Sequence, residues 1–162
     1  MATVTHHAPE TASRRAEASS NNSYDLIVIG SGPAGQKAAI CAAKMRKKVA
    51  VIERKRTIGG VCVHTGTIPS KTFREAILYL SGLRQRTFYG RGYAVKDQIS
   101  MQDLVFRSEM VMGREIEVIK SQLRRNRVVV YEGNARFMDD HTIEVSSEEG
   151  YTTLRGNYFV IA

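Results

Sequence analysis

The stretch GGVCVHTGTIPSK, residues 59–71, places one thiol, Cys62, between a glycine pair and a lysine. Five residues after this thiol stands Thr67, where a second cysteine would complete a dithiol. A threonine hydroxyl is far less acidic than a thiol with a pKa of ~8.5, and it can neither form a disulfide nor relay electrons by thiol exchange. The stretch therefore keeps one sulfur but excludes dithiol chemistry. As a purely structural alternative, Cys62 serves as a small buried apolar residue.

A second group of chemically suggestive residues lies upstream, in GSGPAG, where Gly30, Gly32 and Gly35 have the G-x-G-x-x-G spacing. In a turn from strand to helix, the first glycine permits the sharp bend and the second lets a pyrophosphate approach the backbone. The third allows the helix to pack closely on the strand. Pro33 and Ala34 open the helix, whose free N–H groups and dipole favour a phosphate. The spacing predicts a dinucleotide site, and the plain alternative is a turn without a ligand.

The type of dinucleotide depends on Glu53, which lies 21 residues after Gly32, near the spacing expected for a carboxylate that accepts ribose hydroxyls. A carboxylate there would repel the 2′-phosphate of NADP, so the turn favours FAD or NAD. The following cations, Arg54, Lys55 and Arg56, could be argued to bind that phosphate, but we interpret Lys55 and Arg56 as a solvated charge run. Arg54 is a candidate for stacking near the adenine.

The elements that would position these residues form a βαβ unit. Residues 24–30 and 48–53 are short apolar runs rich in β-branched residues, which is typical of strands buried on both faces. Between them, residues 33–47 have helical periodicity. The residues expected on the apolar face of that helix are Ala34, Ala38, Cys41 and Met45.

Further along, we expect a helix over 67–83, a basic loop over 84–98 and a long helix opened by a capping box at Ser100 and Asp103. The apolar faces expected on these two helices consist of Ile68, Phe73, Ile77 and Leu80 on the first, and Met101, Leu104, Val105, Val111, Ile119 and Leu123 on the second.

The last third of the chain has the pattern of strands. Residues 127–133 are typical of a buried strand, and 135–156 alternate between apolar and polar, with turn signals at 139–140 and 149–150. Residues 157–162 are expected to form a last central strand. A buried strand at the very end suggests a piece of a longer protein. The fold class predicted is α/β, with a doubly wound parallel sheet and a β-meander.

Composition excludes several classes of protein. The 162 residues suit one domain, residues 24–162, after a tail at 1–23 that is too polar to fold. Two cysteines cannot form a disulfide framework, which favours a reducing compartment such as the cytoplasm. No apolar run is long enough for a membrane span. The net charge of +8 invites a nucleic-acid interpretation, but the basic clusters lack aromatics and any nucleic-acid-binding signature. The four histidines suggest no metal site.

The combination of GxGxxG, the acid and GGxCxxxGxIPSK resembles the FAD-dependent pyridine nucleotide–disulfide oxidoreductases, whose pattern is G-G-T-C-x-N-x-G-C-x-P-S-K. The resemblance implies FAD as cofactor. It places Gly59, Gly60, Val61 and Cys62 along the flavin and its diphosphate. It also places Lys71 near flavin N5, with Glu75 as a candidate partner, and the backbone of Ala135, in GNARF, beside the adenine.

The threonine at position 67 departs from that pattern. One branch of the family, which exchanges hydride between NADPH and NAD⁺, has the same replacement, and stretches such as TFREAILYL and GNARFMDDHTIEV resemble that branch. The resemblance therefore implies a hydride-exchanging flavoprotein with NAD(P)H as substrate, active as a homo-oligomer once the NAD(P) and interface domains are present. Two alternatives remain: a disulfide reductase-like enzyme that uses Cys62 alone, and a non-catalytic flavin- or nucleotide-binding module.

Overall fold

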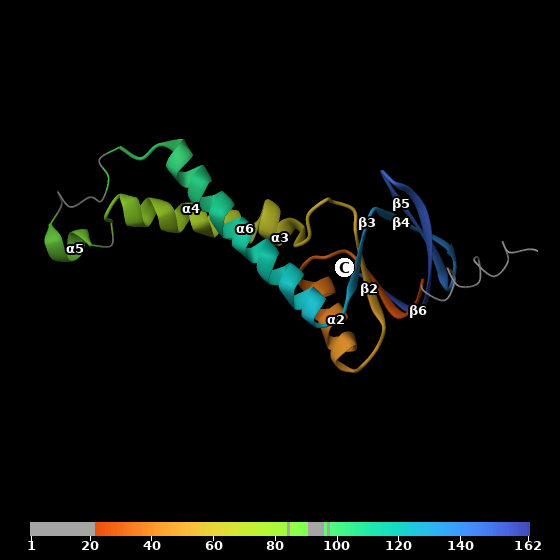
Figure 1. Cartoon of the computed structure of the whole chain (residues 1–162). Coiled ribbons are helices and arrows are strands. Elements are labelled where there is room, and N and C mark those ends of the chain that lie inside the picture. The colour runs from red at the N-terminus through yellow and green to blue at the C-terminus, as the bar shows by residue number, and fades with distance from the viewer. Residues whose placement is uncertain (1–21, 84, 91–95, 97) are drawn as a thin grey trace, which may run out of the picture.

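The computed structural model describes residues 22–83, 85–90, 96 and 98–162. A mixed sheet forms one end of the molecule, and two long helices extend from it as an arm (Figure 1). The first strand begins at Ser23, one residue before the expected start of the domain. Residues 1–21 of the expected tail lie outside the described residues.

The predicted βαβ unit is confirmed. It consists of β1 (Ser23–Ile29), α2 (Pro33–Lys44) and β2 (Val49–Glu53), with β1 and β2 parallel. The helix face was predicted wrongly, however. Ala34, Cys41 and Met45 are exposed, whereas the buried residues are Gly35, Ala39 and Ala42. The apolar residues of this helix lie almost all round it, so their periodicity did not decide which side faces the sheet.

The sheet has six strands in the order β3-β2-β1-β6-β5-β4. The elements not yet introduced are β3 (Val129–Glu132), β4 (Asn134–Asp139), β5 (Thr142–Ser147) and β6 (Gly150–Ile161). The four strands β3, β2, β1 and β6 are parallel, and β4, β5 and β6 form an antiparallel meander. This arrangement confirms the predicted class of parallel α/β sheet with a meander.

Strand β6 belongs to both parts of the sheet. Its residues 150–155 pair with β5, and its residues 155–161 pair with β1. The end of the alternating stretch 135–156 and the last strand expected over 157–162 are therefore joined in one strand of twelve residues. Gly156 lies where the partner changes, and a Cβ there would come within 2.9 Å of the Phe159 ring and 3.0 Å of Ile27. A side chain at this position would therefore displace Phe159 or Ile27, and glycine lets both pack against the backbone of β6.

Each face of the parallel strands carries its own core, because successive side chains of a strand point to opposite faces. On one face, Val28, Val49 and Val51 pack with α2 and with Ile119 and Leu123 from the long helix α6 (Met101–Arg125). The other face carries a second cluster under the curled meander, formed by Tyr24, Ile27, Ala50, Ile52, Ile143, Val145 and Leu154. The two central strands β1 and β2 therefore carry buried apolar side chains on both faces, as expected of strands covered on both sides.

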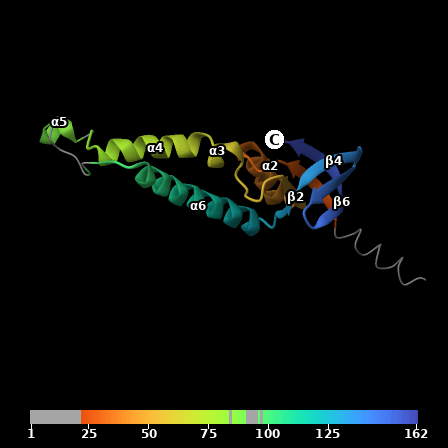
Figure 2. The ribbon, with the colours of Figure 1, turned by 90° about the horizontal axis from the view of Figure 1, so that it is seen from above.

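The arm is formed by α4 (Thr67–Leu80) and α6, which lie side by side and extend away from the sheet (Figure 2). Helix α6 begins with the predicted capping box: the Ser100 hydroxyl accepts from the Asp103 N–H, and the Asp103 carboxylate accepts from the Ser100 N–H. Two short helices were not predicted. They are α3 (Gly60–His64), before α4, and α5 (Arg86–Tyr89), within the stretch expected to be a basic loop. Among the described residues, no helix is long and apolar enough to cross a membrane.

Candidate functional site

A cavity of about 570 Å³ lies at the carboxyl ends of β1 and β2, beside the N-terminus of α2. This edge of a parallel sheet is where open α/β folds bind their ligands. Five segments meet there: the turn after β1, the end of β2, the start of α3, the junction between β3 and β4, and the end of β6. The lining residues are Ile29, Gly30, Ser31, Gly32, Pro33, Ile52, Glu53, Arg54, Lys55, Gly60, Val61, Cys62, Gly133, Asn134, Ala135, Ile161 and Ala162.

The three glycines of the turn have different surroundings. Gly30 has a φ of 106°, a conformation that residues with a side chain rarely adopt. A Cβ on Gly35 would lie 2.1 Å from the carbonyl oxygen of Gly30, so the start of α2 packs backbone to backbone on the turn. A Cβ on Gly32 would meet no protein atom within 4 Å, although Gly32 lines the cavity. Gly32 therefore leaves room for a ligand rather than for another part of the chain.

Glu53 ends β2 at the floor of this cavity and is only 7% exposed. Its Oε2 accepts hydrogen bonds from the Ser31 N–H at 3.0 Å and from the Ser31 hydroxyl at 2.5 Å, and its Oε1 accepts one from the Lys55 N–H at 3.0 Å. Burial by itself would raise the pKa of Glu53, but the hydrogen bonds from Ser31, Lys55 and Arg54 outweigh it and lower the pKa below the ordinary value. The carboxylate is thus ionised and held in one orientation.

The glycine pair at 59–60 brings the cysteine-bearing segment to the same cavity. A Cβ on Gly60 would lie 2.8 Å from the Cα of Gly32, so the two loops touch through their backbones. Helix α3 then presents Val61, which is 65% exposed, and Cys62, which is half-buried, toward the cavity. Cys62 is therefore not a fully buried apolar residue. The other cysteine, Cys41, is exposed on α2 and does not line this cavity.

Most of the residues assigned to the cofactor line the cavity, but four of them do not. Gly35 and Gly59 are buried beneath it, where they support the turn and the start of α3. Ala34 is exposed in the first turn of α2. Lys71 is exposed on α4, outside the lining, and Glu75, its candidate partner, forms an ion pair with Arg74 at 3.0 Å.

Ser31, Gly133 and Asn134 line the cavity although the sequence pattern did not single them out. Ser31 is fully buried and binds Glu53, although it occupies a variable position of the glycine pattern and so attracts no notice. Lys55, interpreted as part of a solvated run, lines the cavity, and Arg56 pairs with Glu148 at 2.6 Å. Gly133 and Asn134 follow β3, and only the strand order places them beside β2.

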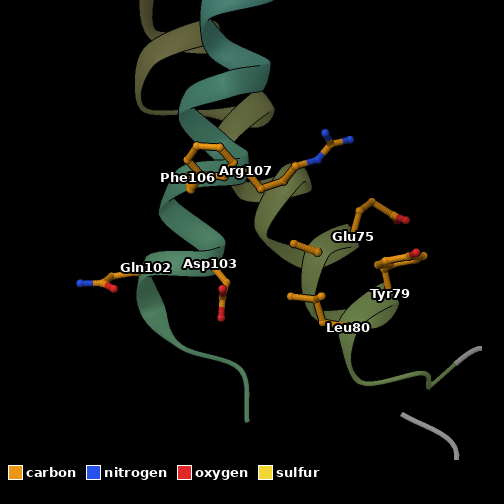
Figure 3. A pocket seen from close by; sticks show the side chains of 8 residues that line it. Glu75, Tyr79, Leu80, Gln102, Asp103, Phe106 and Arg107 are labelled. Carbon is orange, nitrogen blue, oxygen red and sulfur yellow. The ribbon is translucent and has the colours of Figure 1, made fainter. Parts of the chain in front are cut away.

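A second and larger hollow, of about 730 Å³, lies between α4 and α6 (Figure 3). Its lining is a mixture of aromatic, aliphatic and charged side chains from the two helices: Glu75, Ala76, Tyr79, Leu80, Gln102, Asp103, Phe106 and Arg107. It has neither a glycine turn nor the N-terminus of α2, so the features suited to a pyrophosphate belong to the other cavity. Among the described residues, no three His, Cys, Asp or Glu side chains are grouped as metal ligands would be.

Comparisons with known proteins agree with this geometry. The chain is 55% identical over 141 residues to a soluble pyridine nucleotide transhydrogenase of Mycobacterium tuberculosis (strain ATCC 25177 / H37Ra), and 41% identical over 140 residues to one of Hahella chejuensis. Each match covers 86% of this chain, which spans 30% of the length of either relative.

A solved structure gives the same outline. The HOCl-induced flavoprotein disulfide reductase RclA from Escherichia coli, in its Cu(II) complex, matches 87% of this chain with a TM-score of 0.71 and 25% identity. The match covers 28% of the RclA chain. The profile of the pyridine nucleotide-disulphide oxidoreductases matches residues 24–162, which is the whole of the described sheet and arm apart from Asn22 and Ser23. The chain belongs to the pyridine nucleotide-disulphide oxidoreductase family.

Proposed function

We propose that this chain is the FAD-binding part of an enzyme that exchanges hydride between NADPH and NAD⁺. The observation that carries this proposal is the lone thiol at the cavity: Cys62 lines it, and Thr67 stands where the second thiol of a dithiol would be. Two relatives of this chain, at 55% and 41% identity, are named soluble pyridine nucleotide transhydrogenases, which supports the same conclusion. Without a second thiol, electrons can pass between nicotinamides and flavin but not on to a disulfide.

The cavity fits FAD on its own features. The open space at Gly32 and the N-terminus of α2 suit the pyrophosphate, and the ionised Glu53 suits the ribose hydroxyls of the adenosine half. Arg54 follows Glu53 in the chain, and Ala135 lies two residues after Gly133, whose N–H donates to the Glu53 carbonyl oxygen at 2.9 Å. Both residues line the cavity, which supports their assignment to the adenine. The bound cofactor would supply the two-electron hydride chemistry, while the chain binds and orients it.

The cysteine-bearing segment would border the flavin. Gly60 lets the start of α3 touch Gly32 backbone to backbone, and Val61 and Cys62 line the cavity beside that contact. Cys62 would act here as a neighbour of the ring and not as a redox partner. Lys71, on the next helix, would place a cation toward the flavin end, although it lies outside the cavity lining in this chain.

The intact gene product provides the direct test. Purified protein is expected to be yellow and to transfer hydride from NADPH to an NAD⁺ analogue with a distinct absorbance, such as thio-NAD⁺. The same preparation should reduce lipoamide or glutathione disulfide no faster than free FAD does. A colourless protein that takes up no added FAD, or brisk reduction of disulfides, would overturn the proposal.

The reductase-like alternative has one observation in its favour, since the RclA relative is a flavoprotein disulfide reductase. Replacing Cys62 by serine separates the two functions. Hydride exchange by the Cys62→Ser variant is expected to remain within about threefold of the wild-type rate, because uncharged neighbours contribute little to the transfer. A single-cysteine reductase would instead lose turnover. The matched control is Cys41→Ser, because Cys41 is exposed outside the cavity.

Lys71 offers a more specific test of the flavin end. The Lys71→Met variant is expected to retain bound FAD but to be reduced by NADPH about tenfold more slowly, because a cation near the flavin stabilises the charge that reduction brings. Stopped-flow absorbance measures the reductive half-reaction, and fluorescence measures FAD retention. Lys37→Met is the control, as Lys37 is exposed on α2 outside the cavity lining. Unchanged reduction kinetics would remove Lys71 from the mechanism.

We further propose a cytoplasmic, homo-oligomeric enzyme without nucleic-acid or membrane partners. The thiol-poor composition and the relatives' description as soluble support the compartment. Light scattering of the intact gene product would report the oligomeric state, and a monomeric mass at working concentration would contradict it.

A further inference from the structure

Three polar or charged residues are buried among those that the structure describes: Ser31, Glu53 and Ser108. Two of them, Ser31 and Glu53, are hydrogen-bonded to each other. A buried hydroxyl costs free energy unless it is fully hydrogen-bonded, so its partners indicate what it is for. Ser31 is 0% exposed, which leaves it no water to bond instead.

The Ser31 side chain joins two segments that come from different parts of the chain. Its hydroxyl donates to Glu53 Oε2 at 2.5 Å, at the end of β2. The same oxygen accepts a hydrogen bond from the Gly59 N–H at 2.9 Å, at the start of the cysteine-bearing segment. A hydroxyl has one proton and two lone pairs, so this arrangement uses the proton and one lone pair in fixed directions.

Backbone contacts hold the same three segments together: the turn after β1, the end of β2 and the glycine pair at 59–60. The Ser31 N–H donates to the Glu53 carboxylate at 3.0 Å, and the missing Cβ of Gly60 lets that residue touch Gly32, next to Ser31. The turn after β1, the acid and the glycine pair are therefore held as one unit. Ser31 is the residue at which the three are joined.

We propose that Ser31 is a positioning residue, whose hydroxyl aims the Glu53 carboxylate at the cofactor ribose and fastens the 59–62 segment against the phosphate-binding turn. This inference rests on the proposed binding of FAD in the cavity. Ser31 need not touch the reacting atoms. It acts through Glu53 at the adenosine half and through Gly59 at the flavin half, so one hydroxyl sets the geometry of both ends of the site.

Removing the hydroxyl should affect each end in a measurable way. In Ser31→Ala, the carboxylate loses a charge-assisted hydrogen bond but keeps those from the backbone N–H groups of residues 31 and 55, so it is held less firmly in its orientation. The Gly59 N–H is left without a partner in a dry environment, which loosens the start of α3.

The first test compares two ligands on the intact gene product by fluorescence titration. For FAD, Ser31→Ala is expected to raise the Kd by about tenfold or more, the usual effect of losing a hydrogen bond to a charged group. For an FAD analogue whose adenosine lacks the 2′- and 3′-hydroxyls, the same substitution is expected to raise the Kd by less than about threefold. The smaller loss comes from the loosened 59–62 segment and is common to both ligands. The remainder is specific to FAD, because the analogue offers Glu53 nothing to bind. A merely structural role of Ser31 would weaken both ligands equally.

The second test requires no flavin. Hydrogen–deuterium exchange in the cofactor-free protein is expected to quicken in the peptides covering residues 57–63 of Ser31→Ala, and to stay unchanged in those covering α6. The matched control is Ser108→Ala, which removes the other buried serine hydroxyl, on α6 and outside the cavity lining. This variant should leave both the FAD affinity and the exchange at 57–63 at their wild-type values.

The outcomes separate this inference from the proposed function. If the wild-type protein binds no FAD, the proposed function fails, and exchange at 57–63 still decides whether Ser31 fastens the segment. If the wild type binds FAD but Ser31→Ala binds both ligands as the wild type does, the positioning role is overturned while the function stands. Equal losses for the two ligands, or unchanged exchange at 57–63, would also overturn it.

Discussion

The cavity at the sheet edge and the arm of α4 and α6 are built in opposite ways. At the cavity, Glu53 and Ser31 are buried, and their polar atoms are bonded within the chain. On the arm, α4 has no buried residue at all, although its sequence is amphipathic. Large apolar side chains are exposed on α4, on α6 and on the described residues between them: Ile77, Tyr79, Leu83, Phe88, Tyr89, Met101, Val105, Phe106 and Met110.

This contrast shows that contacts within the chain constrain the backbone more tightly at the cavity than on the arm. The cavity's backbone is constrained by glycines that touch other backbone atoms and by hydrogen bonds between segments. The arm is held by the packing of two helices on each other and by the cap at Ser100, with an open hollow between them (Figure 3). Substitutions in the two regions should therefore differ sharply in cost.

The largest effect is expected from Gly35→Ala. The added methyl would lie 2.1 Å from the Gly30 carbonyl oxygen, far inside contact distance, so α2 must move away from β1 or the turn must change shape. We expect the free energy of unfolding to fall by more than about 3 kcal/mol, in the range of severe core changes, and FAD uptake to be lost with it. Urea unfolding followed by circular dichroism measures the first and flavin titration the second. A well-folded, flavin-binding Gly35→Ala would show that the turn tolerates separation of α2 from β1.

A pair of substitutions on α6 gives the next largest difference. Leu123 is 1% exposed and packs against the parallel strands, so Leu123→Ala should lower the free energy of unfolding by about 2–5 kcal/mol. Phe106, on the same helix, is 64% exposed beside the hollow, so Phe106→Ala should change it by only about 0.5 kcal/mol. Both are measured by urea unfolding of this chain. Similar costs at the two positions would break the contrast between the sheet end and the arm.

The smallest expected effect is the response of the two regions to acid. Asp103, which caps α6, has its pKa lowered to about 2, first by hydrogen bonds from Lys96 and then by those from Ser100. A carboxyl whose folded pKa is depressed adds stability above its ordinary value, here 3.8, and this is lost as the pH falls toward 2. NMR titration of the Asp103 carboxyl checks the pKa.

The variant Asp103→Asn should therefore be less sensitive than the wild type to acid between pH 3.8 and 2, as monitored by hydrogen exchange in the first turns of α6. Glu53 loses its contribution below its ordinary value of 4.5, in the same direction. Asp139→Asn is a control outside the arm, because its lowered pKa depends first on the His141 N–H. If the Asp103→Asn variant and the wild type were equally sensitive to acid, the Asp103 carboxylate would not stabilise the start of α6.

Much of the sheet end could be predicted, and the reasons are local. Strands of β-branched residues, glycines at fixed spacing and an acid at the end of β2 each depend on residues near one another in the chain. The same holds on the arm for the capping box at Ser100. The helix faces were less predictable. The face expected on α2 was wrong, and Ile77 and Met101 were expected in apolar stripes yet are 45% and 68% exposed. Periodicity finds an amphipathic helix, but the number of elements packed around it determines how much of the face is covered.

The sequence by itself determined that a glycine turn follows a buried strand, that an acid stands one βαβ unit later, and that only one thiol accompanies the GGxC segment. These features depend only on residue types and on spacings between residues close together in the chain, so they can be recognised without knowing how distant segments meet. Only the tertiary structure decided that β6 serves both halves of the sheet, that Ser31 joins Glu53 to Gly59, and that Lys71 lies outside the cavity lining. Such relations depend on which distant segments meet, and this is set by strand order and packing rather than by any stretch of neighbouring residues.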